Sequence, residues 1–545
     1  MPPKYIFVSG GVLSGLGKGV TAASIALLLQ SRGFRITSIK CENYINIDAG
    51  LINPIEHGDP FLCEDGTETD MDMGTYEKFL NKNVGQHNFI TMGQIYQDVI
   101  KKERNFEYQG EDVEAIPHVC DEIIRRIKEA AKKDQADIAV IELGGTAGEY
   151  QNALYYEASR IMKIVHKDTV IHVHVSYLPT PIHLGEPKTK PTQLSVRLLN
   201  SMGIQPDFIV CRSDKILDQR RRERLAMFCS VEPDDVINNP DEQSVYDVPL
   251  RLEAQKFDLK ILKKINLPAN KIKLEKWKKF VRSTKNITDS IKIAIIGKYF
   301  VTGEYQLRDS YAALLDALDH AGWFLKRQID TKWINAENFD QKNNLLKEID
   351  GIIVPIGWGA RGVEGMISAI TFARENKIPY LGLCYGMQLA AIEFARNVAG
   401  MKNANTVEVE PKTEFPIIHT IPKQKDFLKR RAYGGTMRLG RWDCRILRDT
   451  ISYESYKEYG GFINKEKNIV AERHRHRYEF NDAYAKTLTE KGLVIAGRSM
   501  VENLVEIIEL PQKIHPFFVG TQYHPEYKSR PLNPHPLFIS FLKAC

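Results

Sequence analysis

Short apolar runs alternate with helix-favouring stretches along the chain, and this alternation predicts an α/β fold. The first apolar run, residues 5–8, ends in glycines and is followed by the helix-favouring segment 22–29. Later runs of the same kind predict strands at 35–40, 138–143, 170–175 and 208–211. Strands separated by helices form a mostly parallel sheet that is covered on both faces and binds ligands at the carboxyl ends of its strands. We therefore expect a doubly wound N-terminal domain.

The pattern restarts after a lysine-rich segment around Trp277. New strands are predicted at 292–297, 351–355 and 379–383, with helices near 305–320 and from Glu364. Because 545 residues exceed what one hydrophobic core organises, the chain should form more than one domain. We predict two doubly wound domains, with the following bounds: 1–266, a linker at 267–290, and 291–545.

Charge and cysteine usage exclude several classes of protein. Lys and Arg number 75 against 69 Asp and Glu, and the resulting net charge of +6 is too small to indicate nucleic-acid binding. The 8 cysteines contain no C-x-x-C spacing, so neither a disulfide framework nor a zinc site is indicated. There is no signal-peptide pattern and no apolar run of the roughly 18 residues that a membrane helix needs. We expect a cytoplasmic protein with neither nucleic acid nor membrane as a partner.

Glycines between the first predicted strand and helix form a candidate phosphate-binding loop, residues 10–21. Glycines let backbone N–H groups close around phosphate oxygens, the helix N-terminus adds partial positive charge, and Lys18 adds a formal one. The spacing differs from the usual P-loop, because five residues separate Gly11 from Gly17 and Gly19 stands where Ser or Thr is expected. A nucleoside triphosphate is the expected ligand, and a glycine-rich structural turn is the alternative.

Two carboxylates are candidates for holding Mg²⁺ beside such a triphosphate. Asp72 ends the acidic stretch 64–72, and Glu142 closes a predicted strand. Mg²⁺ takes one or two carboxylates together with phosphate oxygens and water. A solvated acidic loop is the alternative for the acidic stretch.

The segment 188–193, predicted to be a loop, adds two lysines and two hydroxyls that can bind phosphate, and Gln193 can recognise an amide-like base edge.

A candidate nucleophile lies in the second domain. Cys384 stands between a predicted strand and a predicted helix and is flanked by small residues, a position that exposes a nucleophile and surrounds it with N–H groups. Far downstream, His524 follows another predicted strand and Glu526 comes two residues later. Glu526 can orient His524, and His524 can deprotonate Cys384. A purely structural buried cysteine is the alternative.

Several stretches together resemble the CTP synthase family over nearly the whole chain: 10–19, 64–72, 188–193, 434–440 and 472–479. The last two, G-G-T-M-R-L-G and E-R-H-R-H-R-Y-E, are the most specific, whereas the cysteine turn is shared by all class I glutamine amidotransferases. The resemblance implies a dethiobiotin-synthetase-like P-loop amidoligase domain followed by a class I glutaminase. It implies that ATP phosphorylates O4 of UTP and that ammonia from L-glutamine displaces the phosphate, with Mg²⁺ as cofactor and GTP as allosteric activator.

The resemblance also assigns site residues. The catalytic residues would be Cys384, His524 and Glu526, and the Mg²⁺ ligands Asp72 and Glu142. ATP contacts would be Gly15, Leu16, Gly17, Lys18, Gly19, Val20, Asp72, Pro240, Asp241 and Glu242. UTP and CTP contacts would be Ser14, Glu149, Tyr150, Gln151, Lys188, Thr189, Lys190, Pro191, Thr192, Gln193 and Arg224. Glutamine contacts would be Gly357, Tyr385, Gly386, Met387, Gln388, Glu408 and Arg477. Lys40 would be a further basic contact, and residues 434–440 would act as a lid near Arg361.

Three positions depart from the family pattern. Ile356 replaces the first glycine of the P-G-G-F-G turn, so we expect either low basal glutaminase activity or an oxyanion hole that is already set. Tyr385 follows the nucleophile where leucine is usual. Residues 149–151, Glu-Tyr-Gln, stand where the family has Asp-Ile-Glu, and this difference bears on feedback inhibition by CTP.

Two other functions remain open from the sequence. Cobyric-acid-type synthases join the same two kinds of domain, but Glu526 and the stretch 472–479 argue against them. A non-enzymatic filament-forming scaffold would not need the intact set of candidate catalytic residues. The resemblance implies a homotetramer, and filaments are compatible with catalysis.

Overall fold

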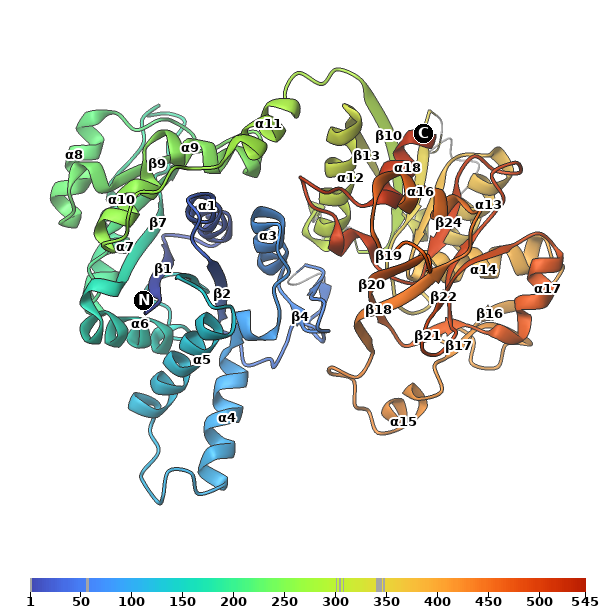
Figure 1. The fold of residues 1–545 in the computed structure, drawn as a ribbon, viewed down its shortest axis with the longest axis horizontal. Helices are drawn as coiled ribbons and strands as arrows, with labels where there is room; N and C mark the ends of the chain where they lie inside the picture. The colour runs from blue at the N-terminus through green and yellow to red at the C-terminus, as the bar shows by residue number, and fades with distance from the viewer. Residues whose placement is uncertain are drawn as a thin grey trace. The chain divides into compact units, whose positions relative to one another are not determined.

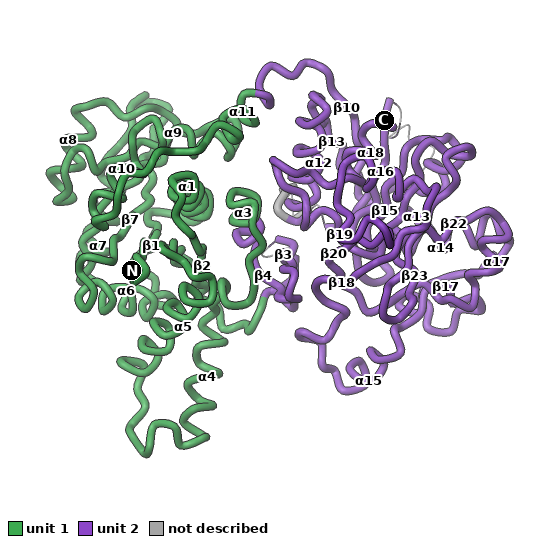
Figure 2. The backbone as a smooth tube through the Cα atoms, viewed as in Figure 1, with its two compact units in different colours: residues 1–48, 75–282 green, residues 49–74, 283–545 purple. Residues whose placement is uncertain are grey.

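The computed structural model describes residues 2–54, 58–299, 301–302, 305–306, 308–339, 346 and 348–545. Figure 2 shows its two compact units, which are residues 1–48 with 75–282, and residues 49–74 with 283–545. The short segment 49–74 thus belongs to the second unit, although it lies early in the chain. Among the described residues no helix has both the length and the apolar character needed to cross a membrane.

The first unit is built on a seven-stranded parallel sheet (Figure 1). Its strands, in spatial order, are β5 (Phe89–Thr91), β2 (Ile36–Glu42), β6 (Ile138–Leu143), β1 (Lys4–Gly11), β7 (Val170–Tyr177), β8 (Phe208–Ser213) and β9 (Val236–Pro240). Its helices are α1 (Lys18–Ser31), α4 (Met92–Arg104), α5 (Cys120–Lys133), α6 (Ala153–Val165), α7 (Lys190–Ser201), α8 (Gln219–Cys229), α9 (Val248–Ala254), α10 (Phe257–Lys264) and α11 (Glu275–Ser283). Side chains of α4, α5 and α6 share one core with Phe7 and Ile141, and α1 packs with α9.

The five strands expected in this unit are present, and they pair in parallel as predicted. The predicted α/β fold class is confirmed. Parallel pairing aligns the carboxyl ends of the strands, and the register places Glu142 beside both Val8 and Lys40. That edge of the sheet carries the predicted nucleotide-binding segments.

The second unit is built on a ten-stranded mixed sheet. Its strands, in spatial order, are β13 (Gln328–Asn335), β10 (Ser290–Gly297), β14 (Gly351–Val354), β15 (Tyr380–Leu383), β24 (Phe518–Thr521), β23 (Val505–Glu509), β22 (Val494–Ser499), β18 (Arg438–Ile446), β20 (Ile469–His476) and β19 (Phe462–Asn464). The first five are parallel and the rest pair antiparallel. Its helices are α12 (Ala312–Leu325), α13 (Val363–Asn376), α14 (Tyr385–Asn397), α15 (Gln424–Lys429), α16 (Ile451–Tyr459), α17 (Ala485–Glu490) and α18 (Pro536–Ala544).

The expected helix at 305–320 is wrong at its start. The helix begins at Ala312, after the short strand β12 (Tyr305–Gln306) and a 3-10 turn over Arg308–Tyr311. Asp309 and Ser310 favour turns and caps over helix interiors, which accounts for the later start. The other strands and helices predicted in this unit are present within a few residues of the expected positions.

The segment 49–74 is held in the second unit by buried polar contacts. It forms the hairpin β3 (Phe61–Leu62) and β4 (Glu68–Thr69) and leads into α3 (Met71–Leu80). Glu68 pairs with Arg475 at 2.6 Å, and Arg473 donates to the Leu62 carbonyl at 2.8 Å. Since Glu68 is buried, the acidic stretch is more than a solvated loop.

Candidate functional site

The turn between β1 and α1 has the backbone of a phosphate-binding loop. Gly15 and Gly17 have positive φ values of 71° and 78°, which side-chain-bearing residues rarely adopt. Gly10 and Gly11 are required for space instead, because a Cβ at Gly10 would lie 2.6 Å from Lys18 Cδ and one at Gly11 would overlap Ser195. Residues 12–15 are exposed, so the backbone of this turn is open to a ligand.

Basic and acidic side chains meet at the carboxyl end of the same sheet. Lys18 Nζ donates to the Gly145 carbonyl at 2.8 Å. Glu142 is buried and accepts from Lys40 Nζ at 2.8 Å and from the Tyr76 hydroxyl, while Lys40 also pairs with Glu42 at 3.0 Å. The Glu142 carboxylate thus shares the Lys40 ammonium with Glu42, and its oxygens have the chemistry that Mg²⁺ prefers. Sequence analysis predicted Lys40 as a basic contact but did not anticipate this pairing.

Asp72, the other predicted Mg²⁺ ligand, lies in the first turn of α3 and is partly exposed. Because residues 49–74 group with the second unit, Asp72 and Glu142 fall in different units. A pairing of the two carboxylates around one cation therefore stays a prediction.

The segment 149–151 lies just after the sheet edge. The Glu149 carboxylate turns back and accepts from the Thr146 backbone N–H at 2.9 Å and from the Thr146 hydroxyl. Tyr150 and Gln151 are exposed. The Glu149 side chain is therefore already engaged by its own loop.

The segment 188–193 was predicted to be a loop, and this is wrong for its second half. Helix α7 begins at Lys190 with Pro191 in its first turn, where proline is favoured because the first N–H groups of a helix have no intrahelical partner. Thr192 and Gln193 are buried, and Gln193 donates to the Thr189 hydroxyl at 3.1 Å.

The remaining predicted nucleotide contacts lie on α8 and at the end of β9. Arg224 is exposed on α8, with its guanidinium 5.9 Å from the ring centre of Phe228. Pro240 ends β9, Asp241 pairs with Arg212 at 2.8 Å, and Glu242 pairs with Arg251 at 2.6 Å.

Cys384 occupies a strained turn in the second unit. It lies between β15 and α14 with φ 51° and ψ −95°, a conformation that costs energy for a residue with a side chain. Its N–H donates to the Thr521 carbonyl at 2.7 Å, and β15 pairs in parallel with β24. The turn points the sulfur toward the segment that follows β24, because Gln522 Nε2 donates to Sγ at 3.4 Å.

His524 and Glu526 lie in that segment and are buried. His524 Nδ1 donates to Glu526 Oε1 at 2.7 Å, and its ring stacks on Tyr527 at 5.1 Å. Burial alone would lower the pKa of His524, but the Glu526 carboxylate and the Cys384 sulfur raise it above its usual range. The cysteine, histidine and glutamate predicted from the sequence are thus brought together by the pairing of β15 with β24.

The residues predicted to bind glutamine surround this turn. Gln388 is buried and donates to the Tyr478 carbonyl and to Gln522 Oε1, both at 3.1 Å. Gly386 leaves no room for a side chain, since a Cβ would lie 2.0 Å from the Val354 carbonyl oxygen. Met387 is fully buried. These three residues lie in the first turn of α14, directly after the cysteine turn.

Arg477 and Glu408 are the two charged members of the predicted glutamine set. Arg477 donates to Gln424 Oε1 at 2.7 Å and to the Tyr433 carbonyl. Glu408 accepts from the Gly359 N–H at 2.8 Å, and burial raises its pKa. Both side chains are therefore held by backbone or side-chain partners before any ligand binds.

Ile356 does not adopt a positive φ, so its β-branched side chain causes no strain in this conformation. Its side chain is buried, and its carbonyl accepts from the Tyr311 hydroxyl at 3.4 Å. Gly357, its neighbour, has no space for a side chain, because a Cβ would lie 2.8 Å from Lys298 Cε.

Sequence analysis missed Gln522, Lys298 and Arg438. Gln522 lies two positions before His524, and Lys298 directly follows the predicted strand 292–297. Their positions at the ends of predicted strands could therefore have identified both residues. Arg438 lies in the stretch 434–440, which was singled out only as a lid.

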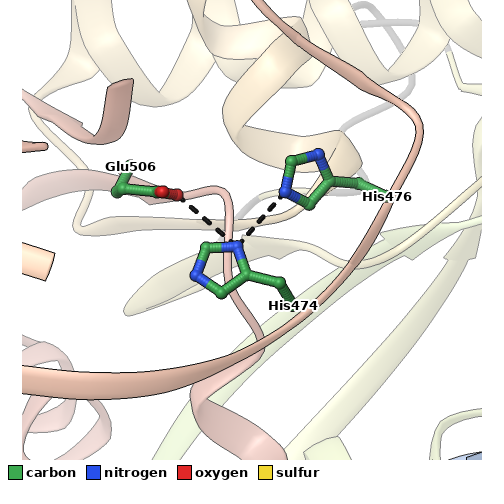
Figure 3. Close-up of side chains that lie close together, drawn as sticks. All are labelled: His474, His476 and Glu506. Carbon is green, nitrogen blue, oxygen red and sulfur yellow. Dashed lines mark hydrogen bonds and ion pairs between the residues drawn. The ribbon is translucent and has the colours of Figure 1, made fainter. Parts of the chain in front are cut away.

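Figure 3 shows a second group of polar side chains, in which His474, His476 and Glu506 converge. One ligand atom from each lies within 4.8 Å of the others, which is a geometry that a metal ion can use. The Arg438 guanidinium already fills this place, since it donates to His474 Nδ1 at 2.9 Å and His476 Nε2 at 3.2 Å and pairs with Glu506 at 2.8 Å. The cluster is therefore a buried arginine site.

The two imidazoles of this cluster must stay neutral. His476 Nδ1 donates to the Tyr478 carbonyl at 2.9 Å, which leaves Nε2 as the acceptor for Arg438. Burial, and after it the charge of Arg438, hold the pKa of both His474 and His476 well below the usual range. Below about pH 6.5 the unfolded chain binds protons that the folded chain does not. The free energy of unfolding therefore decreases as the pH is lowered below about 6.5.

We expect His476→Gln to make thermal unfolding less sensitive to acid. A glutamine oxygen can accept from Arg438 but does not titrate, so between pH 6.5 and 5.5 the variant should lose about 1 kcal/mol less stability than the unaltered chain. The measurement is the unfolding midpoint across pH 7.5 to 5.5, with the exposed His183→Gln as control for loss of an imidazole. Equal pH slopes for the His476→Gln and unaltered chains would contradict this account.

Comparisons with known proteins divide the chain into two matched regions, and the first region includes residues 49–74, which group with the second unit. The family described as "CTP synthase N-terminus" matches residues 4–267, and "Glutamine amidotransferase class-I" matches residues 306–544. A protein of Caldanaerobacter subterraneus subsp. tengcongensis named CTP synthase is 50% identical over 544 residues, covering 99% of this chain and 98% of the relative. One of Clostridium acetobutylicum with the same name is 43% identical over 549 residues, covering 100% of this chain and 99% of the relative.

Among solved structures, the chain is similar to the glutaminase domain of Trypanosoma brucei CTPS with bound acivicin. The identity is 34%, the TM-score is 0.41, and the match covers 47% of this chain and 93% of that chain.

The two matched domains define a glutamine-hydrolysing ligase, in which an amidotransferase is joined to a synthase domain. The chain belongs to the CTP synthase family. Membership of this family implies that UTP, ATP and glutamine are substrates.

Proposed function

We propose that the chain aminates UTP to CTP through a 4-phosphorylated UTP intermediate, with ammonia that Cys384, His524 and Glu526 release from L-glutamine. The observation that carries the proposal is the strained turn at Cys384, which lies against the segment bearing the His524–Glu526 pair. A purely structural cysteine would have no need of a strained backbone.

In the glutaminase half, His524 takes the proton of the Cys384 thiol, and the sulfur attacks the amide carbon of glutamine. Backbone N–H groups around the turn stabilise the oxyanion of the tetrahedral intermediate. His524 then protonates the departing ammonia, and water hydrolyses the thioester to glutamate. Glu526 holds the ring of His524 in place and stabilises its charged form.

In the synthase half, the glycine turn 10–19 and Lys18 hold the phosphates of ATP, and O4 of UTP attacks the γ-phosphorus. Ammonia adds at C4, and phosphate leaves. Glu142 and Asp72 are the candidate Mg²⁺ ligands, and Mg²⁺ when bound offsets negative charge on the transferring phosphoryl group. The buried Glu142 carboxylate supports this role, because it is paired with Lys40 at the edge of the sheet where ligands bind.

GTP as an activator of the glutaminase, and a homotetrameric assembly, are further parts of the proposal that rest on family membership. The stretch 434–440 is the candidate lid; it follows Tyr433, whose carbonyl accepts from Arg477, and includes the buried Arg438 at the start of β18.

The test is the transfer of label from glutamine to CTP. When no free ammonia is added, the chain should convert UTP to CTP only with both ATP and glutamine present, and [amide-15N]glutamine should deliver its label to the C4 amino group. A corrinoid substrate offered in place of UTP should give no product. Turnover of the corrinoid, or no CTP from UTP, would contradict the proposed function.

Feedback by CTP should be weaker or altered compared with a relative that has Asp-Ile-Glu at the positions of residues 149–151. The longer Glu149 is engaged by Thr146, and Gln151 lacks a charge, so contacts to the cytosine amino group are changed. The measurement is the CTP inhibition constant beside such a relative, with the KM for UTP as control. An equally tight constant would show that the two patterns are equivalent.

A further inference from the structure

The backbone of Pro355–Gly359, which we call the oxyanion loop, is held by side chains at four of its backbone polar groups. The Trp358 N–H donates to the Tyr299 hydroxyl at 3.2 Å, and the Gly359 N–H donates to Glu408 at 2.8 Å. The Ile356 carbonyl accepts from Tyr311. This loop follows β14, the neighbour of β15 in the sheet.

The Gly359 carbonyl oxygen accepts two strong hydrogen bonds. Lys298 Nζ donates at 2.8 Å and the Tyr385 hydroxyl at 2.9 Å. Lys298 also donates to the Arg361 carbonyl at 3.1 Å, and its ammonium lies 4.6 Å from the ring centre of Tyr385. The two side chains therefore hold the same oxygen and also contact each other.

Both donors keep their protons in the physiological range. Burial raises the pKa of Tyr385, so its hydroxyl does not ionise. Burial lowers the pKa of Lys298 to about 8, opposed by the nearby Glu408, so the ammonium is still the major form at pH 7. Hydrogen bonds from a charged donor are stronger than neutral ones.

Tyr385 directly follows Cys384 in the chain, so one residue connects the nucleophile turn with the oxyanion loop. A leucine, which is usual at this position in the family, has no donor for the Gly359 oxygen. Gly357 fits the same arrangement, because only a residue without a side chain leaves room for the Lys298 stem.

We propose that Lys298 and Tyr385 are positioning residues for glutamine hydrolysis, which clamp the Gly359 carbonyl and so preset the oxyanion loop before glutamine or an activator binds. The inference rests on the proposed glutaminase function and adds to it a reason why Ile356 is tolerated. A loop that is already set has no need of the backbone rotation that a glycine at position 356 would allow.

The test is Tyr385→Phe in the full chain, which removes one hydroxyl and keeps the ring. Without GTP, kcat for glutamine hydrolysis should fall three- to tenfold, about the effect of one hydrogen bond, while KM changes less than about twofold. The ratio of the rates with and without GTP should rise. In this variant the oxyanion loop is no longer preset, so GTP binding has more effect on its order. CTP synthesis from free ammonia should not change.

Lys298→Met should lower kcat by about tenfold or more, and Lys298→Arg should restore part of it because a donor and a charge are retained. Tyr459→Phe is the matched control, since it removes a hydroxyl of the same unit that accepts from Lys543 at 3.1 Å. It should leave all rates unchanged.

Unchanged kcat and unchanged GTP ratio in Tyr385→Phe would overturn the inference. So would a parallel loss of ammonia-dependent synthesis, which would mean that the effect is not confined to the loop. Failure of the proposed function has a different signature, namely glutamine hydrolysis that survives Cys384→Ala. If Cys384→Ala is inactive and Tyr385→Phe equals the unaltered chain, only the inference fails.

Discussion

Cys384→Ala should abolish glutamine-dependent CTP synthesis and leave ammonia-dependent synthesis intact. Without the sulfur no glutamyl thioester can form, whereas the loss of one small side chain costs only about 1 kcal/mol of local packing. The measurement is CTP production from UTP and ATP with either glutamine or ammonium chloride, near pH 8, where some ammonia is unprotonated. The glutamine-dependent rate should fall by at least about a thousandfold, as expected for loss of a covalent nucleophile.

Cys545→Ala is the matched control, because that cysteine belongs to the same unit, follows the end of α18 and donates its S–H to the Phe541 carbonyl at 3.2 Å. It should keep both rates. His524→Ala should behave like Cys384→Ala, since it removes the base that we propose takes the proton of the thiol and then protonates the ammonia. Loss of both activities in a folded Cys384→Ala chain would refute two separate sites, and a retained glutamine rate would remove Cys384 from the mechanism.

Glu142→Gln or Asp72→Asn should lower CTP synthesis by at least about a hundredfold, from glutamine and from ammonia alike. In the proposed mechanism, either change removes a hard anionic ligand from a Mg²⁺-dependent phosphoryl transfer. In Glu142→Gln the Lys40 ammonium also loses the Glu142 carboxylate as a partner and keeps Glu42. Glutamine hydrolysis should survive better, because its chemistry needs no phosphoryl transfer.

The measurement is the rate of CTP formation as a function of Mg²⁺ concentration, where excess Mg²⁺ should recover part of the loss. Glu157→Gln serves as control, since it removes a carboxylate of the first unit that pairs within α6, with Arg160 at 2.6 Å. Near-normal synthesis by both Glu142→Gln and Asp72→Asn at low Mg²⁺ would rule out these residues as ligands.

The parallel strands could be predicted because each is a short apolar run bounded by glycine or polar residues, as at residues 138–143. The antiparallel half of the second sheet was not predicted. Strand β20 (Ile469–His476) contains arginine and histidine side chains that are all buried, so no apolar pattern marks it. Only the tertiary structure supplies the partners, such as Glu68 and Glu506, that make those charges tolerable in the interior.

The site shows the same division. Cys384 and His524 were predicted because each follows a recognisable strand, and the parallel pairing of β15 with β24 brings them together. The clamp on the Gly359 oxygen was not predicted. Lys298 and Tyr385 lie far apart in the chain, and neither belongs to a spacing motif.

By itself the sequence determined the α/β class, and it located the glycine turn that we predict to bind phosphate and the candidate cysteine, histidine and glutamate. These follow from local patterns, since period, glycine placement and residue chemistry act over a few neighbours. The tertiary structure alone decided that residues 49–74 join the second unit, that Arg438 fills a metal-like cluster, and that five side chains hold the oxyanion loop. Those features depend on contacts between buried charges and backbone groups that are far apart in the sequence. A local sequence pattern does not predict such contacts.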